Sequence, residues 1–264
     1  MSKVNLLAVS VGNTRTRVGA FVEGKLTETA TFVNQREGEL GDAMEHAFGC
    51  LRDKDGSVVL LASVNAEARS RIEVQIENHL HREILRVERD LSIPIGRQLD
   101  PEAMVGEDRL LNAAAAFDVL NQACVVVDAG TAITVDFIDG AGTFHGGAIG
   151  PGAQLALDSL NSRTEQLPEV EFVRPLEAIG HNTIEAMRAG VFYGLRGMVS
   201  ELVERFAEQV GSYPVVVATG GDANLLFRDY ELIDRIVPDL TLTGLAVTLR
   251  VAMDQGKNPS SIKD

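Results

Sequence analysis

The sequence predicts an α/β protein of two similar lobes, because one short segment of the chain occurs nearly twice. Residues 9–16 (VSVGNTRT) resemble residues 127–134 (VDAGTAIT), and each copy follows an apolar run. Both copies predict a buried strand, a glycine turn and a second strand. A chain of 264 residues is long enough to bury two modest cores. We therefore expect one lobe over residues 1–105 and another over residues 106–264, with an approximate boundary.

The first half is predicted to form a strand meander followed by a helix, a strand, a helix and a strand. The meander is expected because apolar runs are separated by turn residues such as Glu23-Gly24. Apolar residues then recur at helical spacing in two stretches, and the run VVLLA between them is typical of a buried strand. The expected elements are strands 6–9, 17–21 and 26–32, helix 38–51, strand 58–62, helix 66–80 and strand 84–87.

The second half follows a connector at residues 92–105, which contains Pro94 and Pro101. A helix is expected to start near Asp108, and the second hairpin comes after it. Residues 146–152 (GGAIGPG) are expected to form a loop whose glycines let backbone amides approach a ligand. The remaining expected elements are helices 153–162 and 182–210, strand 215–218 and helix 243–253.

The composition argues against several classes of protein. The net charge is −14 and the 24 Lys and Arg residues form no cluster, so no nucleic-acid partner is expected. The apolar stretches are too short to cross a bilayer and no apolar leader opens the chain, so we expect a cytoplasmic protein without a membrane partner. The two cysteines are expected to be small buried hydrophobic residues, and the five scattered histidines predict no zinc site. The P-loop and Rossmann motifs are absent.

The first repeated turn carries chemistry that suits phosphate oxygens. Residues Gly12 to Thr16 combine backbone amides, two hydroxyls, an amide and a guanidinium. A Gly-Asn pair also closes many ordinary hairpins, so this turn alone does not distinguish a phosphate site from a simple turn. The second copy, with Gly130 and Thr131, favours phosphate binding, because two such turns from facing lobes can hold a polyphosphate between them.

The two copies differ at one acidic position, which is Asp128 in the second copy and Ser10 in the first. A carboxylate at the end of so apolar a strand is costly unless it meets a cation or hydrogen-bond donors. An ion is therefore the expected partner of Asp128. Asp136 is expected either across the same hairpin or as a solvated strand residue.

A third polar segment, Gly106 to Arg109, stands at the start of a predicted helix. Asp108 either caps this helix and complements its dipole or faces the cleft between the lobes. In the second case it accepts a proton from a substrate hydroxyl, while Arg109 clamps an anionic group. The residues themselves leave both interpretations open.

In this order, the motifs resemble those of the type III pantothenate kinases, of the acetate and sugar kinase, heat-shock ATPase and actin superfamily. The resemblance covers nearly the whole chain and implies two ribonuclease-H-like lobes, a duplicated βββαβα core, an interlobe ATP cleft and a homodimer. The matching segments are Gly12–Thr14, Gly106–Arg109 with Asn112-Ala113, Asp128–Ala132, Gly146–Gly152, Gly180–Thr183 with Glu185–Met187, Thr219–Gly221 and Pro238–Leu245.

The resemblance also implies an activity. The γ-phosphoryl group of ATP would pass to the primary hydroxyl of pantothenate, giving 4′-phosphopantothenate in the first step of coenzyme A synthesis. Asp108 would be the general base. Gly106, Glu107 and Arg109 would hold pantothenate, and Thr183 would reach it from the partner subunit.

For the nucleotide, the resemblance implies a division of roles between the two turns. Thr131 would contact the phosphates of ATP, and Asp128 would bind a monovalent cation, K⁺ or NH₄⁺. The first turn would bind the ATP phosphates and Mg²⁺. The residues of this turn are Ser10, Val11, Gly12, Asn13, Thr14, Arg15, Thr16 and Arg17.

Three features depart from the family pattern. Ser10 replaces an aspartate expected to organise Mg²⁺, and a loss of about 3 kcal/mol would slow turnover roughly a hundredfold, unless Arg15 neutralises phosphate instead. Residues 97–99 (RQL) lack a substrate-contacting tyrosine, and the spacing from Pro101 to Gly106 is one residue longer. The alternatives are therefore a weakened or inactive relative acting as a binding or regulatory protein, and a kinase for another small hydroxy acid.

Overall fold

The computed structural model describes residues 4–34, 38–52, 54 and 56–257. Contacts divide the chain into two compact units. The first unit contains Met1–Ile95, Pro101–Asp118 and Leu240–Asp264. The second unit contains Gly96–Asp100 and Val119–Asp239.

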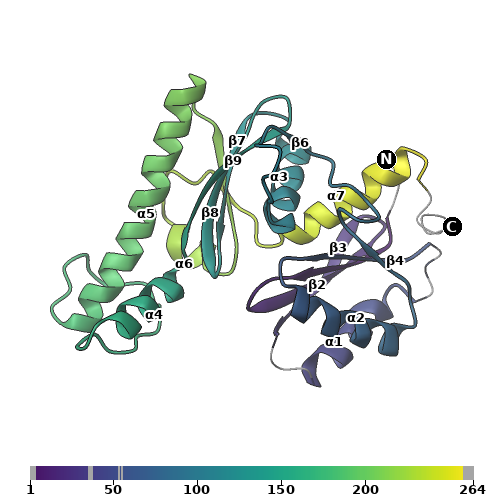
Figure 1. Ribbon diagram of the computed structural model, residues 1–264, viewed down its shortest axis with the longest axis horizontal. Helices are drawn as coiled ribbons and strands as arrows, with labels where there is room; N and C mark the ends of the chain where they lie inside the picture. Colours follow the sequence, from purple (N-terminus) through teal and green to yellow (C-terminus); the bar gives the residue numbers. More distant parts are fainter. Residues whose placement is uncertain (1–3, 35–37, 53, 55, 258–264) are drawn as a thin grey trace. The chain divides into compact units, whose positions relative to one another are not determined.

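The first unit is built on a five-stranded sheet with the order β3-β2-β1-β4-β5. The strands β1 to β3 are antiparallel neighbours, and β4 and β5 run parallel to β1. Helices α1 and α2 lie on one face of this sheet and α7 lies on the other (Figure 1). The elements are β1 (Leu6–Val11), β2 (Arg15–Val22), β3 (Lys25–Val33), α1 (Gly38–Gly49), β4 (Val58–Ser63), α2 (Ala66–Leu80), β5 (Ile84–Arg86), α3 (Glu107–Leu120) and α7 (Leu240–Asp254).

Strand alternation divides the side chains of β1 between the two faces of the sheet. Leu7, Val9 and Val11 are buried in the core shared with α1 and α2, because residues two apart in a strand point to the same face. Ala8 and Ser10 therefore lie on the face that carries α7. The cores on both faces fix the register of β1.

Two glycines allow close packing on the α7 face. A Cβ atom at Gly19 of β2 would lie 2.9 Å from Leu242 Cδ1 of α7. A Cβ atom at Gly244 of α7 would lie 2.3 Å from the carbonyl oxygen of Leu111 in α3. Helices α3 and α7 thus approach each other more closely than any larger residue at position 244 permits.

The second unit is built on a six-stranded sheet with the order β11-β10-β7-β8-β9-β6. Residues of β7, β8 and β10 pack with α4, α5 and α6 in one hydrophobic core, and these helices lie on one side of the sheet in Figure 1. The elements are β6 (Gly96–Arg97), β7 (Cys124–Ala129), β8 (Ala132–Ile138), β9 (Thr143–Pro151), α4 (Ala153–Arg163), α5 (Thr183–Val210), β10 (Val215–Thr219), α6 (Ala223–Phe227) and β11 (Arg235–Ile236).

The internal repeat predicted from the sequence is present in the topology of both sheets. The order β9-β8-β7-β10-β11 in the second unit reproduces β3-β2-β1-β4-β5 in the first. In each unit a hairpin of antiparallel strands is followed by two parallel strands. The expected helices and central strands are also present, but the short β6, β11 and α6 were not predicted.

The expected loop at residues 146–152 is wrong, because these residues mostly lie in strand β9. The glycines serve packing against the neighbouring strand. A Cβ atom at Gly147 would lie 1.9 Å from the carbonyl oxygen of Val135 in β8. A glycine run that suits a ligand loop also suits a crowded strand, so the sequence pattern did not separate the two.

The residues 106–118 and 240–257 come after the predicted lobe boundary at residue 105, yet they group with the first unit. The chain therefore returns to the first sheet through α7. The two lobes expected over residues 1–105 and 106–264 stay a prediction, because the two units are defined by contacts and not by one break in the sequence.

We predict that Gly244→Ala lowers the free energy of unfolding by about 1–3 kcal/mol, because the added methyl group overpacks the α3–α7 contact. Gly49→Ala at the end of α1 is the matched control, since Gly49 is exposed and a Cβ atom there meets nothing within 4 Å. Its higher helix propensity should leave stability unchanged or raise it by up to about 1 kcal/mol. Urea unfolding followed by circular dichroism measures both. Equal stability of the two variants would contradict the close packing.

Candidate functional site

The first candidate segment is the turn between β1 and β2. The Gly12 N–H donates to the carbonyl oxygen of Arg15 at 3.0 Å and closes the turn. Asn13, Thr14 and Arg15 are exposed, whereas Thr16 is buried on the α2 side of the sheet. Polar groups at the tip are therefore open to a ligand while the base of the turn is fixed.

The side chain of Asn34, just after β3, holds this turn from behind. Its Nδ2 donates to the carbonyl oxygens of Gly12 at 2.8 Å and Asn13 at 3.2 Å. Its Oδ1 accepts from the Thr16 hydroxyl at 2.8 Å, and its backbone N–H donates to the carbonyl oxygen of Thr14 at 3.0 Å. One amide residue thus fixes four positions of the turn.

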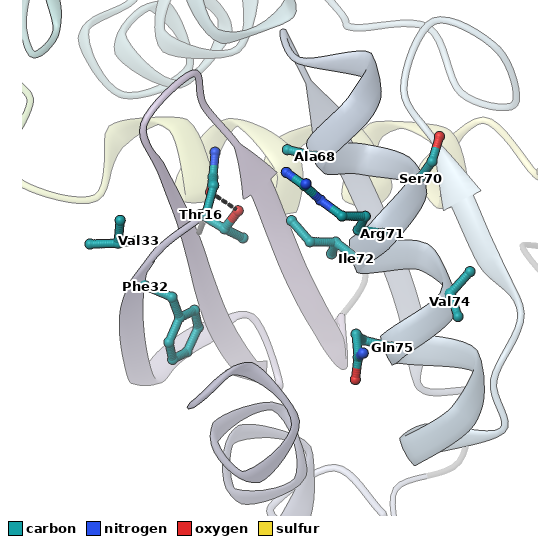
Figure 2. Close-up of a pocket in the computed structure, with 10 residues that line it drawn as sticks. Thr16, Phe32, Val33, Ala68, Ser70, Arg71, Ile72, Val74 and Gln75 are labelled. Carbon is teal, nitrogen blue, oxygen red and sulfur yellow. Dashed lines mark hydrogen bonds between the residues drawn. The ribbon is translucent and has the colours of Figure 1, made fainter. Parts of the chain in front are cut away.

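Thr16 and Asn34 also line a pocket of about 310 Å³ between the sheet and α2. Figure 2 shows Thr16 and Phe32 on the sheet side of this pocket and Ala68 and Ile72 on the helix side. Thr16 is 1% exposed, so water has little access to its hydrogen bond with Asn34. Less competition from water makes such a bond a firmer support.

The loop Ser63–Asn65, which begins with the last residue of β4, connects this turn with the start of α3. The Val64 N–H donates to the carbonyl oxygen of Val11 at 3.1 Å, and the Ser63 N–H donates to the Glu107 carboxylate at 2.7 Å. Asn65, which caps α2 through Ala68, also reaches the carbonyl oxygen of Asn13 at 3.5 Å. The turn between β1 and β2 and the start of α3, which contains Asp108, therefore both contact this loop.

Asp108 lies in the first turn of α3, and its side chain is held locally. Its Oδ1 accepts from the Arg109 N–H at 2.8 Å. Burial raises the pKa of this carboxyl above its usual range, and the Arg109 hydrogen bond and charge only partly offset that. A partly desolvated carboxylate with a raised pKa is a better proton acceptor than an ordinary aspartate.

The Glu107 carboxylate accepts a hydrogen bond from the Ser63 N–H. Burial raises its pKa as well, with the Ser63 hydrogen bond acting in the opposite direction. The Arg109 N–H donates to the carbonyl oxygen of Gly106 at 3.1 Å, where α3 begins. The expected substrate roles of Gly106, Glu107 and Arg109 stay predictions.

The second turn, between β7 and β8, repeats the scheme of the first. The Gly130 N–H donates to the carbonyl oxygen of Ala132 at 3.0 Å, and Thr131 is exposed at the tip. Asp128 is half-buried at the end of β7, where a Cβ atom at Gly220 would lie 2.5 Å from its Oδ1. The glycine at position 220, with φ of +96°, leaves this side of the carboxylate open.

Asp128 lies directly opposite Thr134 in the hairpin. The Thr134 Oγ1 is buried and has no hydrogen-bond partner among the residues that the structure describes. Asp136 pairs with Val126 instead and is 2% exposed. Asp136 is thus on the same face as Asp128 but is not opposite it, and the expectation of a solvated residue is wrong.

Thr183 is the first residue of α5 and is exposed. Asn182 caps this helix by accepting from the Glu185 N–H at 2.9 Å, and the Glu185 carboxylate accepts from the His181 N–H at 2.8 Å. The capping box fixes the direction in which α5 begins. The expected substrate role of Thr183 stays a prediction.

Sequence reasoning missed Asn34 and the loop Ser63–Asn65. Asn34 offered only the weak signal of an amide directly after a strand. Asn65 is recognisable as a helix cap before Ala66, but its second contact with the turn depends on the parallel pairing of β1 with β4. The structure brings together the first turn and the Gly106–Arg109 segment within one unit.

Solved structures with the same fold define the class of protein. The chain superposes on a Baf family protein of Campylobacter jejuni with a TM-score of 0.59 and 18% identity, covering 95% of this chain and 98% of that one. Component A of (R)-2-hydroxyglutaryl-CoA dehydratase from Acidaminococcus fermentans gives 0.54 at 13% identity, covering 96% and 98%. An archaeal actin homolog gives 0.51 at 11%, covering 96% and 100%. The fold is that of actin-like proteins with two ribonuclease-H-like lobes, as predicted.

Sequence comparison identifies the family within that class. The family model for type III pantothenate kinase matches residues 6–205. Type III pantothenate kinases from Syntrophobacter fumaroxidans and Acidothermus cellulolyticus are 36% and 35% identical, covering 92% and 91% of this chain and 96% of each relative. One from Dehalococcoides mccartyi is 33% identical, covering 92% and 96%. The chain belongs to the type III pantothenate kinase family.

We predict that Asn34→Ala weakens ATP binding about tenfold, which corresponds to about 1.4 kcal/mol. The variant removes the Asn34 Nδ2 group, which now holds the turn by donating to the carbonyl oxygens of Gly12 and Asn13. Asn161→Ala is the matched control, because Asn161 Nδ2 also donates to a backbone oxygen, that of Leu167, at 2.8 Å. Isothermal titration calorimetry measures both affinities. An unchanged affinity in Asn34→Ala would remove Asn34 from the support of the site.

Proposed function

We propose that this protein transfers the γ-phosphoryl group of ATP to the primary hydroxyl of pantothenate, giving ADP and 4′-phosphopantothenate in the first step of coenzyme A synthesis. Membership of the family supports the reaction. The observation that carries it here is the loop Ser63–Asn65, which contacts both the turn after β1 and the start of α3. The backbone and side-chain donors of the turn after β1 and the Asp108 carboxylate, whose pKa is raised, are thereby held in one unit.

In this proposal Asp108 is the general base. The hydroxyl oxygen of pantothenate attacks the γ-phosphorus, its proton passes to the Asp108 carboxylate, and the bond to ADP breaks. The raised pKa of Asp108 makes it a stronger acceptor for that proton. Arg109 follows directly in α3, where its charge suits the carboxylate of pantothenate.

The glycine turns supply donors for the phosphates. Phosphoryl transfer depends on positioning and charge neutralisation more than on covalent chemistry. Thr14 and Thr131 are exposed at the tips of their turns, and their hydroxyls and neighbouring amides can bind phosphate oxygens.

The monovalent cation fits the second turn. Asp128 offers a half-buried carboxylate, and the Thr134 Oγ1 opposite it is a buried oxygen without a partner among the described residues. Hard cations such as K⁺ take oxygen ligands of this kind. Asp128 and Thr134 would hold the ion, which would supply positive charge to the bound phosphates.

Mg²⁺ does not fit the first turn in the way the resemblance implied. Residues 10–17 contain no carboxylate, and Mg²⁺ is usually held by one or two carboxylates together with substrate phosphates. In the part of the chain that the structure describes, no group of three or more His, Cys, Asp or Glu side chains could hold a metal. No step of the reaction is assigned to a protein-held Mg²⁺ at this turn.

Ser10 also favours a second candidate function. A relative that binds nucleotide without efficient turnover would act as a binding or regulatory protein. The segment Arg97-Gln98-Leu99 supplies no tyrosine near the substrate, which also leaves room for a different small hydroxy acid. A panel of hydroxy acids with ATP separates these outcomes by mass spectrometry of the phosphorylated products.

We further propose a homodimer formed through α5, in the cytoplasm. No helix within the described ranges has the length and apolar character needed to span a membrane. Gly190, Gly194 and Gly197 line exposed positions of α5 where a Cβ atom would meet nothing within 4 Å. The apolar groove between α4 and α5 includes Leu155 and Gly190. A second copy of α5 can pack closely there, and Thr183 would then reach the partner's substrate.

We expect Asp108→Asn to reduce turnover by about 10²–10⁴-fold while the fold persists, because the Asn side-chain oxygen can still accept the Arg109 N–H. In the wild type, turnover should fall as pH drops through the raised pKa of Asp108, above the usual value of about 3.9. The control Glu102→Gln, at an exposed connector residue, should keep wild-type rates. Product formation from pantothenate is measured by mass spectrometry, and an unaffected Asp108→Asn would exclude Asp108 as base.

The stability of Asp108→Asn should also differ from the wild type with pH. Because the folded-state pKa is raised, the native state favours the protonated carboxyl. Wild-type stability from this group is therefore full at low pH and is lost as pH rises through that pKa. Asp108→Asn should lack this decline in a series of thermal melts.

For the dimer, we predict that Gly190→Arg yields a folded monomer with little turnover, because the side chain is accommodated within one subunit but not between two α5 helices. Gln209→Arg places the same charge at the exposed end of α5 and should remain dimeric and active. Light scattering after size exclusion measures the mass. A dimeric Gly190→Arg would place the interface elsewhere.

A further inference from the structure

The two repeated hairpins each have a cross-strand pair beside the turn, and these corresponding pairs carry opposite charge. In the first, Ser10 pairs with Arg17 across β1 and β2. In the second, Asp128 pairs with Thr134 across β7 and β8. Directly opposite residues of an antiparallel pair point to the same face with Cβ atoms about 4.5–5.5 Å apart. The charged member of the pair is therefore a cation on β2 in the first hairpin and an anion on β7 in the second.

The position of the Ser10–Arg17 pair follows from the register. The preceding pair on the same face, Ala8 and Gly19, lies under α7, where a Cβ atom at Gly19 would meet Leu242. Ser10 and Arg17 are one pair nearer the turn, and both are half-buried. Arg17, not Arg15, is thus the arginine beside Ser10, which changes the expectation drawn from the sequence.

The backbone carbonyl oxygens of this turn each accept a hydrogen bond. The carbonyl oxygen of Val11 accepts from the Val64 N–H, and that of Arg15 accepts from the Gly12 N–H. Asn34 donates to the three carbonyl oxygens between them. Its Nδ2 donates to the carbonyl oxygens of Gly12 and Asn13, and its backbone N–H donates to the carbonyl oxygen of Thr14. Five consecutive carbonyl groups are engaged as acceptors. Residues 10–17 also contain no carboxylate, the side chain by which proteins usually hold Mg²⁺, so the turn has little to offer this cation.

What the turn can offer is a set of donors and a guanidinium. Arg binds phosphate through two parallel N–H···O bonds, which position the group as well as neutralise it. We propose that the first turn binds nucleotide phosphate directly through Arg17, in place of a divalent ion held by the protein. This inference rests on the proposed function, because it assigns the ATP phosphates to this turn.

The consequence is a nucleotide affinity that depends weakly on divalent metal. The test uses the full-length protein and the non-hydrolysable analogue AMP-PNP, titrated by calorimetry in EDTA and in excess Mg²⁺. We expect the wild-type dissociation constants in the two buffers to agree within about threefold, because each tenfold step needs about 1.4 kcal/mol that the metal does not provide here. Binding is read directly, so turnover is not required.

Arg17→Met keeps the length of the side chain and removes its charge, and we expect affinity in EDTA to fall at least about tenfold. Arg52→Met is the matched control, since Arg52 is an exposed arginine of the same unit after α1, and it should bind as the wild type does. Ser10→Asp places a carboxylate beside Arg17, so its binding should weaken in EDTA and recover with Mg²⁺. Circular dichroism establishes that each variant is folded.

The outcomes separate this inference from the proposed function. A wild type that binds AMP-PNP only with Mg²⁺ overturns the inference and leaves the kinase proposal in place. Folded Arg17→Met that binds as tightly as the wild type in EDTA does the same. A wild type that binds no nucleotide in either buffer overturns both. Weak metal dependence together with a loss in Arg17→Met and metal rescue in Ser10→Asp supports the assignment.

Discussion

Hydrogen bonds to the carbonyl oxygens of residues 11–15 hold the first turn in a single shape. One donor is the Gly12 N–H of the turn itself, and the others come from Asn34 after β3 and from the loop after β4, which are distant in sequence. Because these donors belong to different elements, the turn is ordered only when the whole sheet is assembled. The same loop receives the Glu107 carboxylate, so the start of α3, and with it Asp108, is positioned by the same constraint.

The second unit repeats this backbone scheme with different side chains. The Asp222 N–H donates to the carbonyl oxygen of Ala129 at 2.9 Å, as the Val64 N–H does to that of Val11. Main-chain hydrogen bonds therefore preserve the geometry of a glycine turn at both places. Chemistry diverges at the side chains beside the turns, where Arg17 and Asp128 give one hairpin a positive and the other a negative charge.

Burial of two carboxylates at the start of α3 carries a cost to stability. Burial raises the pKa of Asp108 and of Glu107, which means that each charged carboxylate is less favourable folded than in water. Glu107 recovers part of that cost through the Ser63 N–H. For Asp108 the Arg109 hydrogen bond and charge, together with its own backbone N–H, offset part of the same cost.

The sequence determined the repeated hairpins, most helices and strands, and the polar segments at their ends, because hydrophobic periodicity and turn chemistry are local properties. It also marked Asp108, Asp128 and both glycine turns through residue type and spacing. The tertiary structure alone decided that residues 146–151 lie in a strand, that Asn34 supports the first turn, and that Arg17 stands opposite Ser10. These depend on strand register and on contacts between distant segments, which a linear pattern does not encode.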